Sequence, residues 1–87
     1  MIKIYKFYSD SCGPCKLVEK QLTDSDIEHI NVNINNENKA NMLEEFNIKT
    51  VPTVIAVDDN NTIKFSKIGV FNKLNINDLK QIIKKYS

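Results

Sequence analysis

The run from Ile2 to Tyr8 constrains the fold more than any other stretch of the chain. It carries apolar or aromatic side chains at both odd and even positions, so both faces of an extended strand would be largely apolar. A strand of this kind is stable where other layers cover it on both sides. We therefore expect it to be a central strand, in a sheet with helices packed on both faces.

A helix is expected to begin at the two cysteines that follow this strand. Ser9-Asp10-Ser11 interrupts the apolar run, and Pro14 stands where the first turn of a helix tolerates a residue without a backbone N–H. The polar segment Thr23-Asp24-Ser25-Asp26 would end the helix. Its apolar stripe would consist of Leu17, Val18 and Leu22.

The middle of the chain predicts a second strand and a second helix. Residues 30–34 alternate apolar and polar side chains, which is typical of a half-buried strand. The next pattern, from Asn38 to Phe46, has the spacing of an amphipathic helix. The expected core residues of these two elements are Ile30, Val32 and Ile34, then Ala40, Leu43 and Phe46.

The last part of the chain predicts a hairpin and a closing helix. Thr53 to Val57 is a short apolar run, residues 58–61 form a polar turn, and Thr62 to Ile68 alternates apolar and polar residues. Asn75, with Asp78 three positions later, resembles a capping box at the start of a helix. The apolar side of that helix would hold Ile76, Leu79, Ile82, Ile83 and Tyr86.

The order of these elements predicts an α/β fold. It is βαβ-α-ββ-α, in which a parallel pair of strands precedes an antiparallel hairpin. We therefore expect a four-stranded mixed sheet flanked by three helices. A chain of 87 residues has the size of one small domain, so residues 1–87 are expected to form a single unit.

Composition excludes several classes of function. The formal net charge is +1 and the lysines are spread along the chain, so nucleic acid is not the expected partner. No apolar run approaches the roughly 20 residues that span a bilayer, and the beginning of the sequence lacks a signal-peptide pattern. The expected location is cytoplasmic. In that reducing compartment, two cysteines three positions apart indicate a catalytic dithiol.

Cys12 and Cys15 have the spacing needed for thiol–disulfide exchange. A thiolate attacks a disulfide, and a cysteine at a helix N-terminus is ionised more readily because unpaired backbone N–H groups stabilise its charge. Cys12 would be this nucleophile, and Cys15, one turn further on, would resolve the mixed disulfide. Gly13 would leave the approach to Cys12 open, and Pro14 would stiffen the turn.

The motif Cys12-Gly13-Pro14-Cys15 after a strand, together with Val51-Pro52-Thr53 before a later strand, resembles the thioredoxin family. The resemblance covers almost the whole chain and implies a minimal thioredoxin fold, without the extra N-terminal strand and helix of thioredoxins. It implies a cis peptide bond before Pro52 and pairing of the Val51 backbone with an extended substrate segment. Gly69 matches a family glycine that lets a partner approach closely.

Two positions depart from the family pattern. Ser11 stands where thioredoxins usually have a tryptophan, and Lys6 stands where they usually have a buried aspartate that assists proton transfer at the second cysteine. If Lys6 points toward Cys15, its charge would favour the thiolate and make the protein a weaker reductant, which its reduction potential would reveal. The alternative is that Lys6 lies along the core and keeps its ammonium group in water.

Other interpretations of the chain stay open. A glutaredoxin-like, glutathione-dependent oxidoreductase would share the short N-terminus and Val51-Pro52, and a thioredoxin-like fold can also act as a binding module without redox turnover. The expected partners are disulfide-containing proteins, with thioredoxin reductase or glutathione as electron donor, in electron transport and cell redox homeostasis. No cofactor or oligomer is expected. No metal site is expected either, since Cys12, Cys15 and His29 do not complete a four-ligand zinc site.

Overall fold

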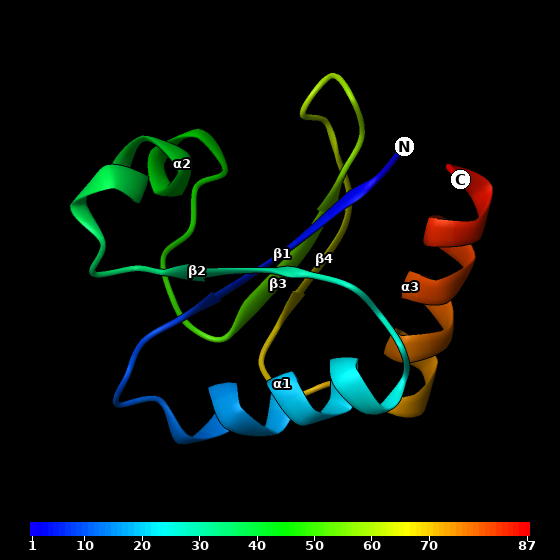
Figure 1. Cartoon of the computed structure of the whole chain (residues 1–87), viewed down its shortest axis with the longest axis horizontal. Helices are drawn as coiled ribbons and strands as arrows, with labels where there is room; N and C mark the ends of the chain where they lie inside the picture. The colour runs from blue at the N-terminus through cyan, green and yellow to red at the C-terminus, as the bar shows by residue number, and fades with distance from the viewer.

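The first strand, β1 (Lys3–Tyr8), lies inside a four-stranded sheet, as the sequence predicted. The computed structural model describes residues 1–87, and its strands are arranged in the order β2-β1-β3-β4 (Figure 1). β1 pairs in parallel with β2 (Ile30–Asn33) and antiparallel with β3 (Thr53–Val57), which pairs antiparallel with β4 (Ile63–Ile68). The predicted mixed sheet and the hairpin are confirmed.

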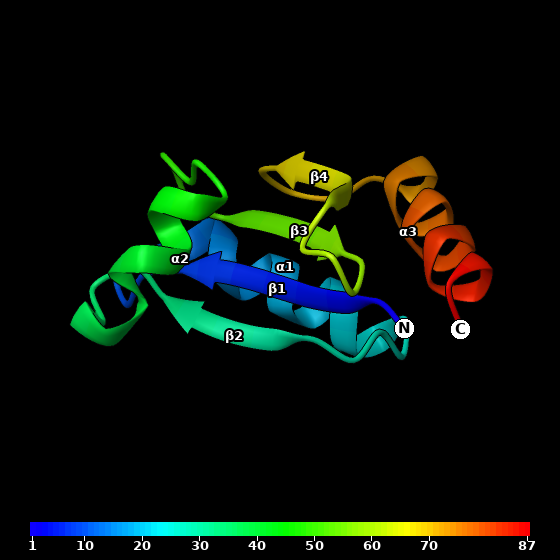
Figure 2. The ribbon, with the colours of Figure 1, turned by 90° about the horizontal axis from the view of Figure 1, so that it is seen from above.

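Helices cover both faces of the sheet. α1 (Gly13–Asp24) and α3 (Lys73–Lys85) pack on one face, and a 3-10 turn, η1 (Glu37–Lys39), followed by α2 (Ala40–Glu45) lies on the other. The view in Figure 2 shows the strands between α1 and α2. The observed order is therefore the predicted βαβ-α-ββ-α. None of the helices combines the length and the apolar character that a membrane span requires.

Two hydrophobic clusters hold these layers together. Side chains alternate along a strand, so neighbours on β1 enter opposite clusters: Ile4 packs under α1 and α3, whereas Tyr5 and Phe7 pack under α2. Burial of both faces confirms the interpretation of the first strand. The first cluster contains Ile4, Val18, Leu22, Ile27, Val54, Ala56, Phe71 and Leu79, and the second contains Tyr5, Phe7, Val32, Phe46, Ile55 and Val57.

Some predicted core positions are wrong. Leu17 is 47% exposed, because the buried face of α1 is the one that carries Cys15, Val18 and Leu22. Ile30 is also 47% exposed, whereas Val32, two residues later on the same face of β2, is 1% exposed, so the core covers only the later part of this edge strand. The predicted helix over residues 38–46 begins as the 3-10 turn η1. In α2, Ala40 is exposed, and Met42 and Leu43 pack against the core with Phe46.

The cap of α3 lies three residues earlier than predicted. Asn72, not Asn75, is the N-cap residue: its side-chain oxygen accepts from the Asn75 backbone N–H at 2.8 Å, and its own N–H donates to the Asn75 side chain at 2.9 Å. The sequence rule for a capping box expects an acid or glutamine at the third helical position. An asparagine performs that function here, so the true pair was missed.

Two leucines of α3 provide a test of the core. Leu79 is fully buried in the first cluster and Leu74 is 71% exposed. Leu79→Ala should lower the free energy of unfolding by about 2 to 5 kcal/mol, because it removes buried methyl groups and leaves a cavity. The matched change Leu74→Ala should alter it by less than about 0.5 kcal/mol. Urea unfolding measures both, and equal losses would contradict this packing.

Candidate active site

The cysteine motif forms the beginning of α1. Cys12 is the N-cap residue, with extended backbone angles of φ −95° and ψ 103°, and Gly13 and Pro14 are the first helical residues. Pro14 fits there because the first N–H groups of a helix have no partner within it. The Cys12 backbone N–H donates to the Ser9 carbonyl at 3.3 Å, which anchors the turn. The helix thus begins at the motif, as the sequence predicted.

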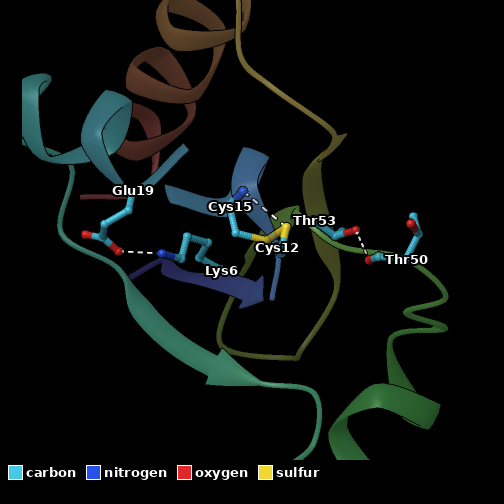
Figure 3. The surroundings of a disulfide bond; sticks show 6 residues. All are labelled: Lys6, Cys12, Cys15, Glu19, Thr50 and Thr53. Atoms are coloured by element: carbon cyan, nitrogen blue, oxygen red, sulfur yellow. Dashed lines mark hydrogen bonds and ion pairs between the residues drawn. A yellow bond between two sulfur atoms is a disulfide. The ribbon is translucent and has the colours of Figure 1, made fainter. Parts of the chain in front are cut away.

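Cys12 Sγ receives a backbone hydrogen bond from the helix that it caps. The Cys15 N–H donates to this sulfur at 3.2 Å, and the N-terminal end of the helix is the positive end of its dipole. In this structure the two cysteines form a disulfide, with their Cα atoms 5.3 Å apart (Figure 3). Once that bond is reduced, the same N–H group favours a thiolate on Cys12.

The two sulfurs differ in their access to solvent. Cys15 is 3% exposed, whereas Cys12 is half-buried. Gly13 leaves free space beside the motif, since no heavy atom lies within 4 Å of the place where its Cβ would stand. An incoming disulfide can therefore contact Cys12, and Cys15 is shielded behind it.

The loop before β3 meets the end of β4 beside the disulfide. The Val51–Pro52 peptide bond is cis, as the resemblance implied, and the Gly69 N–H donates to the Pro52 carbonyl at 2.9 Å. Thr53 Oγ1 donates to the Thr50 carbonyl at 2.7 Å, and both threonines belong to the surroundings of the disulfide (Figure 3). Residues 51–53 and Gly69 are thus brought together.

Gly69 adopts a backbone conformation that suits glycine. Its φ is +90°, which L side chains rarely adopt, and a Cβ on it would have no atom within 4 Å. The space beside Gly69 is open. Another chain could approach the backbone closely at this point.

Lys6 is buried, and its environment corrects the prediction that its ammonium group lies in water. Its side chain is 6% exposed and forms an ion pair with Glu19 Oε1. Its Nζ also lies 5.2 Å from the centroid of the Tyr8 ring. Figure 3 shows the ammonium group directed toward Glu19 and not toward the sulfurs, so the expected orientation of Lys6 toward Cys15 is wrong. The expected effect of its charge on the reduction potential stays a prediction.

Glu19 and His29 belong to the surroundings of Lys6 and were missed. His29 lies just before β2, with Nε2 2.9 Å from Glu19 Oε1 and Nδ1 2.9 Å from the Ile27 carbonyl oxygen. The spacing of four residues from Cys15 signals that Glu19 shares its helix face. No comparable signal exists for His29, whose contact depends on the path of the chain between α1 and β2.

The ion pairs keep Glu19 charged. Burial alone would raise the pKa of its carboxyl, but the hydrogen bonds from Lys6 and His29, and the charges of both, lower the pKa to about 2. The carboxylate therefore balances the buried ammonium group of Lys6 over most of the pH range. A buried lysine without such a partner would be strongly destabilising.

A cavity of about 410 Å³ connects these charges with the sulfurs. Its lining includes Cys12, Cys15, Lys6 and Glu19. Tyr8 and Asp10 also line it, and the Asp10 carboxylate accepts a hydrogen bond from Asn33 Nδ2 at 3.3 Å. A larger open hollow of about 620 Å³ is lined by Glu19 and His29 but by neither cysteine, so both sulfurs face only the smaller one of these two.

Exchange through a helix-capping cysteine is the chemistry of thiol–disulfide oxidoreductases, and the site has the features of that class. The family model described as thioredoxin matches residues 2–85. The chain therefore belongs to the thioredoxin family, and its sheet with three helices is a minimal thioredoxin fold. At the level of the family, its activity is thiol–disulfide oxidoreduction, its substrates contain disulfides and its electrons come from a reductase.

Solved structures agree with this assignment. Oxidised thioredoxin from Plasmodium falciparum is 26% identical, with a TM-score of 0.69 over 98% of this chain and 80% of that one. Thioredoxin f2 from Chlamydomonas reinhardtii is 27% identical, with a TM-score of 0.69 over 99% and 79%. A Malassezia sympodialis thioredoxin, 16% identical with a TM-score of 0.72 over 98% and 76%, shares the fold. No curated protein sequence matches significantly.

The ion pairs of Glu19 should make the folded protein sensitive to acid. Its pKa is about 2 in the folded chain, against an ordinary value of 4.5 for a glutamate carboxyl. The stabilisation is therefore complete above about pH 5 and is lost as the pH falls toward about 2. The shift alone corresponds to about 3 kcal/mol. Because the side chain is 38% exposed, solvent screening lowers the expected effect to about 1 kcal/mol.

Urea unfolding at about pH 6 and about pH 3 measures this effect. The wild-type chain should lose about 0.6 kcal/mol more than the double variant Lys6→Met/Glu19→Gln, because most but not all of the effect is lost at about pH 3. The double variant has neither the carboxylate nor an unpaired lysine. All other carboxylates are common to both proteins, so they cancel in the comparison. An equal loss in the two proteins would contradict the role of Glu19.

Proposed function

We propose that this chain reduces disulfide bonds in proteins, with Cys12 as the nucleophile and Cys15 as the resolving cysteine. The observation that carries the proposal is the contrast between the two sulfurs: Cys12 is half-buried and capped by the Cys15 N–H, and Cys15 is 3% exposed. Attack from outside would occur at the ionised, accessible sulfur. The second sulfur would react only within the protein.

The reaction proceeds in two exchange steps. The Cys12 thiolate attacks one sulfur of the substrate disulfide, forms a mixed disulfide and releases the other substrate sulfur as a thiolate. Cys15, after losing its proton, then attacks Cys12 Sγ, and the first substrate sulfur leaves. Two electrons pass from the dithiol to the substrate, and the Cys12–Cys15 disulfide remains. Both electrons are carried by the cysteines, so we propose no bound cofactor.

We propose that the substrate segment lies along residues 51–53 and Gly69. Gly69 donates its N–H to Pro52 and leaves open space beside it, so an extended chain can approach this part of the site. The Val51 backbone would pair with that chain. A substrate held there would present its disulfide to Cys12, since Thr53 belongs to the surroundings of the disulfide (Figure 3).

The electron donor is part of the same proposal. The family as a whole uses a reductase, and we propose an NADPH-dependent thioredoxin reductase as the donor and the cytoplasm as the location. Glutathione is the alternative donor. Consumption of NADPH, with thioredoxin reductase or with glutathione and glutathione reductase, distinguishes the two.

Reduction of insulin by the pre-reduced chain tests the function. The wild-type protein should reduce the insulin disulfides catalytically, and Cys12→Ser should show only the uncatalysed rate because the nucleophile is absent. Cys15→Ser should accumulate a mixed disulfide through Cys12, visible by mass spectrometry without reductant. Inactive wild-type protein would contradict the proposal and favour a binding module. If the Cys12→Ser variant instead accumulated a mixed disulfide through Cys15, the assigned roles of the two cysteines would be reversed.

A further inference from the structure

The charges of Lys6 and Glu19 face the same space as the two sulfurs. Both side chains line the cavity that Cys12 and Cys15 also line. Lys6 comes from β1 and Glu19 from α1, one turn after Cys15 on the same helix face. The ion pair therefore joins the sheet to the helix at the position where the dithiol lies, as Figure 3 shows.

Glu19 holds the buried ammonium group in a fixed place. Its carboxylate accepts from Lys6 Nζ and from Thr23 Oγ1, the latter at 3.1 Å, and His29 Nε2 lies within 3.0 Å of both its oxygens. These partners come from β1, from α1 and from the segment before β2. The Lys6 side chain is 6% exposed, so water does little to screen its charge.

The positive charge of Lys6 and the negative charge of Glu19 have opposite electrostatic effects on a thiolate at the site. The disulfide form of the site is neutral, but the reduced form carries a thiolate, so an unbalanced nearby charge changes the energy of the reduced form only. A positive charge stabilises that form and makes the protein a weaker reductant. A negative charge does the reverse. With both groups present, the two effects largely cancel.

We propose that Glu19 is a positioning residue that restrains the effect of Lys6 on the dithiol, so that the balance of this ion pair sets the reduction potential. The inference rests on the proposed function, since it assumes that Cys12 and Cys15 cycle between dithiol and disulfide. It assigns the buried Lys6 a charged partner on the facing helix, and the sequence-based predictions did not pair these two residues. It also predicts that neutralising Lys6 and neutralising Glu19 shift the reduction potential in opposite directions.

Equilibration with reduced and oxidised glutathione tests the inference. Oxidised glutathione takes two electrons from the two cysteines and gives two glutathione thiols, and the protein forms its disulfide. One of the two protons comes from the Cys15 thiol and the other from solvent, because Cys12 is a thiolate. Glu19→Gln should shift the equilibrium constant about tenfold toward the reduced protein, or about 30 mV. Lys6→Met should shift it about tenfold the other way. The double variant should lie within about threefold of wild type.

The exposed ion pair Lys20–Asp24 of the same helix supplies the matched control. Its Nζ–Oδ2 distance is 3.4 Å, and its side chains are 71% and 65% exposed. Lys20→Met and Asp24→Asn change the net charge by the same amounts as the test variants but in water, so neither should move the equilibrium by more than about twofold. Circular dichroism of each oxidised variant checks that it is folded.

The outcomes separate this inference from the function on which it rests. One outcome is that the wild-type protein exchanges reversibly while Lys6→Met and Glu19→Gln shift the equilibrium constant in the same direction or not at all. That result would overturn the inference and leave the oxidoreductase proposal standing. Wild-type protein that neither equilibrates with glutathione nor reduces insulin would overturn both. If it reduces insulin but exchanges too slowly with glutathione, the same equilibrium is measured with dithiothreitol. If Glu19→Gln fails to fold, Lys6→Met and the double variant still test the inference. Adding Glu19→Gln to Lys6→Met must then reverse the shift that Lys6→Met causes in the equilibrium constant.

Discussion

The backbone N–H groups at the beginning of α1 are the constraint on which the rest of the site depends. Because Cys12 caps this helix, its sulfur receives the Cys15 N–H at 3.2 Å, and the same turn carries Cys15 into the core. Burial of Val18 and Leu22 fixes the rotation of the helix on the sheet. The positions of both sulfurs therefore follow from how the helix packs.

The central strand supplies the second constraint. Alternation along β1 places Tyr5 and Phe7 under α2, and it places Lys6 under α1, next to the site. A lysine at that position can be buried only with a counter-charge, which Glu19 provides from the facing helix. One strand position thus links the stability of the fold to the electrostatics of the dithiol.

Patterns between neighbours in sequence predicted most of the fold. The two apolar runs predicted β1 and β3, and the polar turn between two strand patterns predicted the hairpin, because these signals depend on local spacing. Local spacing could not tell that Leu17 is exposed, since this depends on the rotation of α1 against the sheet. The pairing of Lys6 with Glu19 and His29 joins three separate segments, so only the assembled fold shows it.

The shielding of Cys15 also affects the kinetics of the site. Cys15 is 3% exposed and lies one helical turn from Cys12, so in the proposed mechanism it would resolve a mixed disulfide in a unimolecular step with a high effective concentration. The lifetime of that intermediate would then be set mainly by this internal step and would depend little on how much free thiol surrounds the protein. The chain itself would thus set the time for which it remains attached to its substrate.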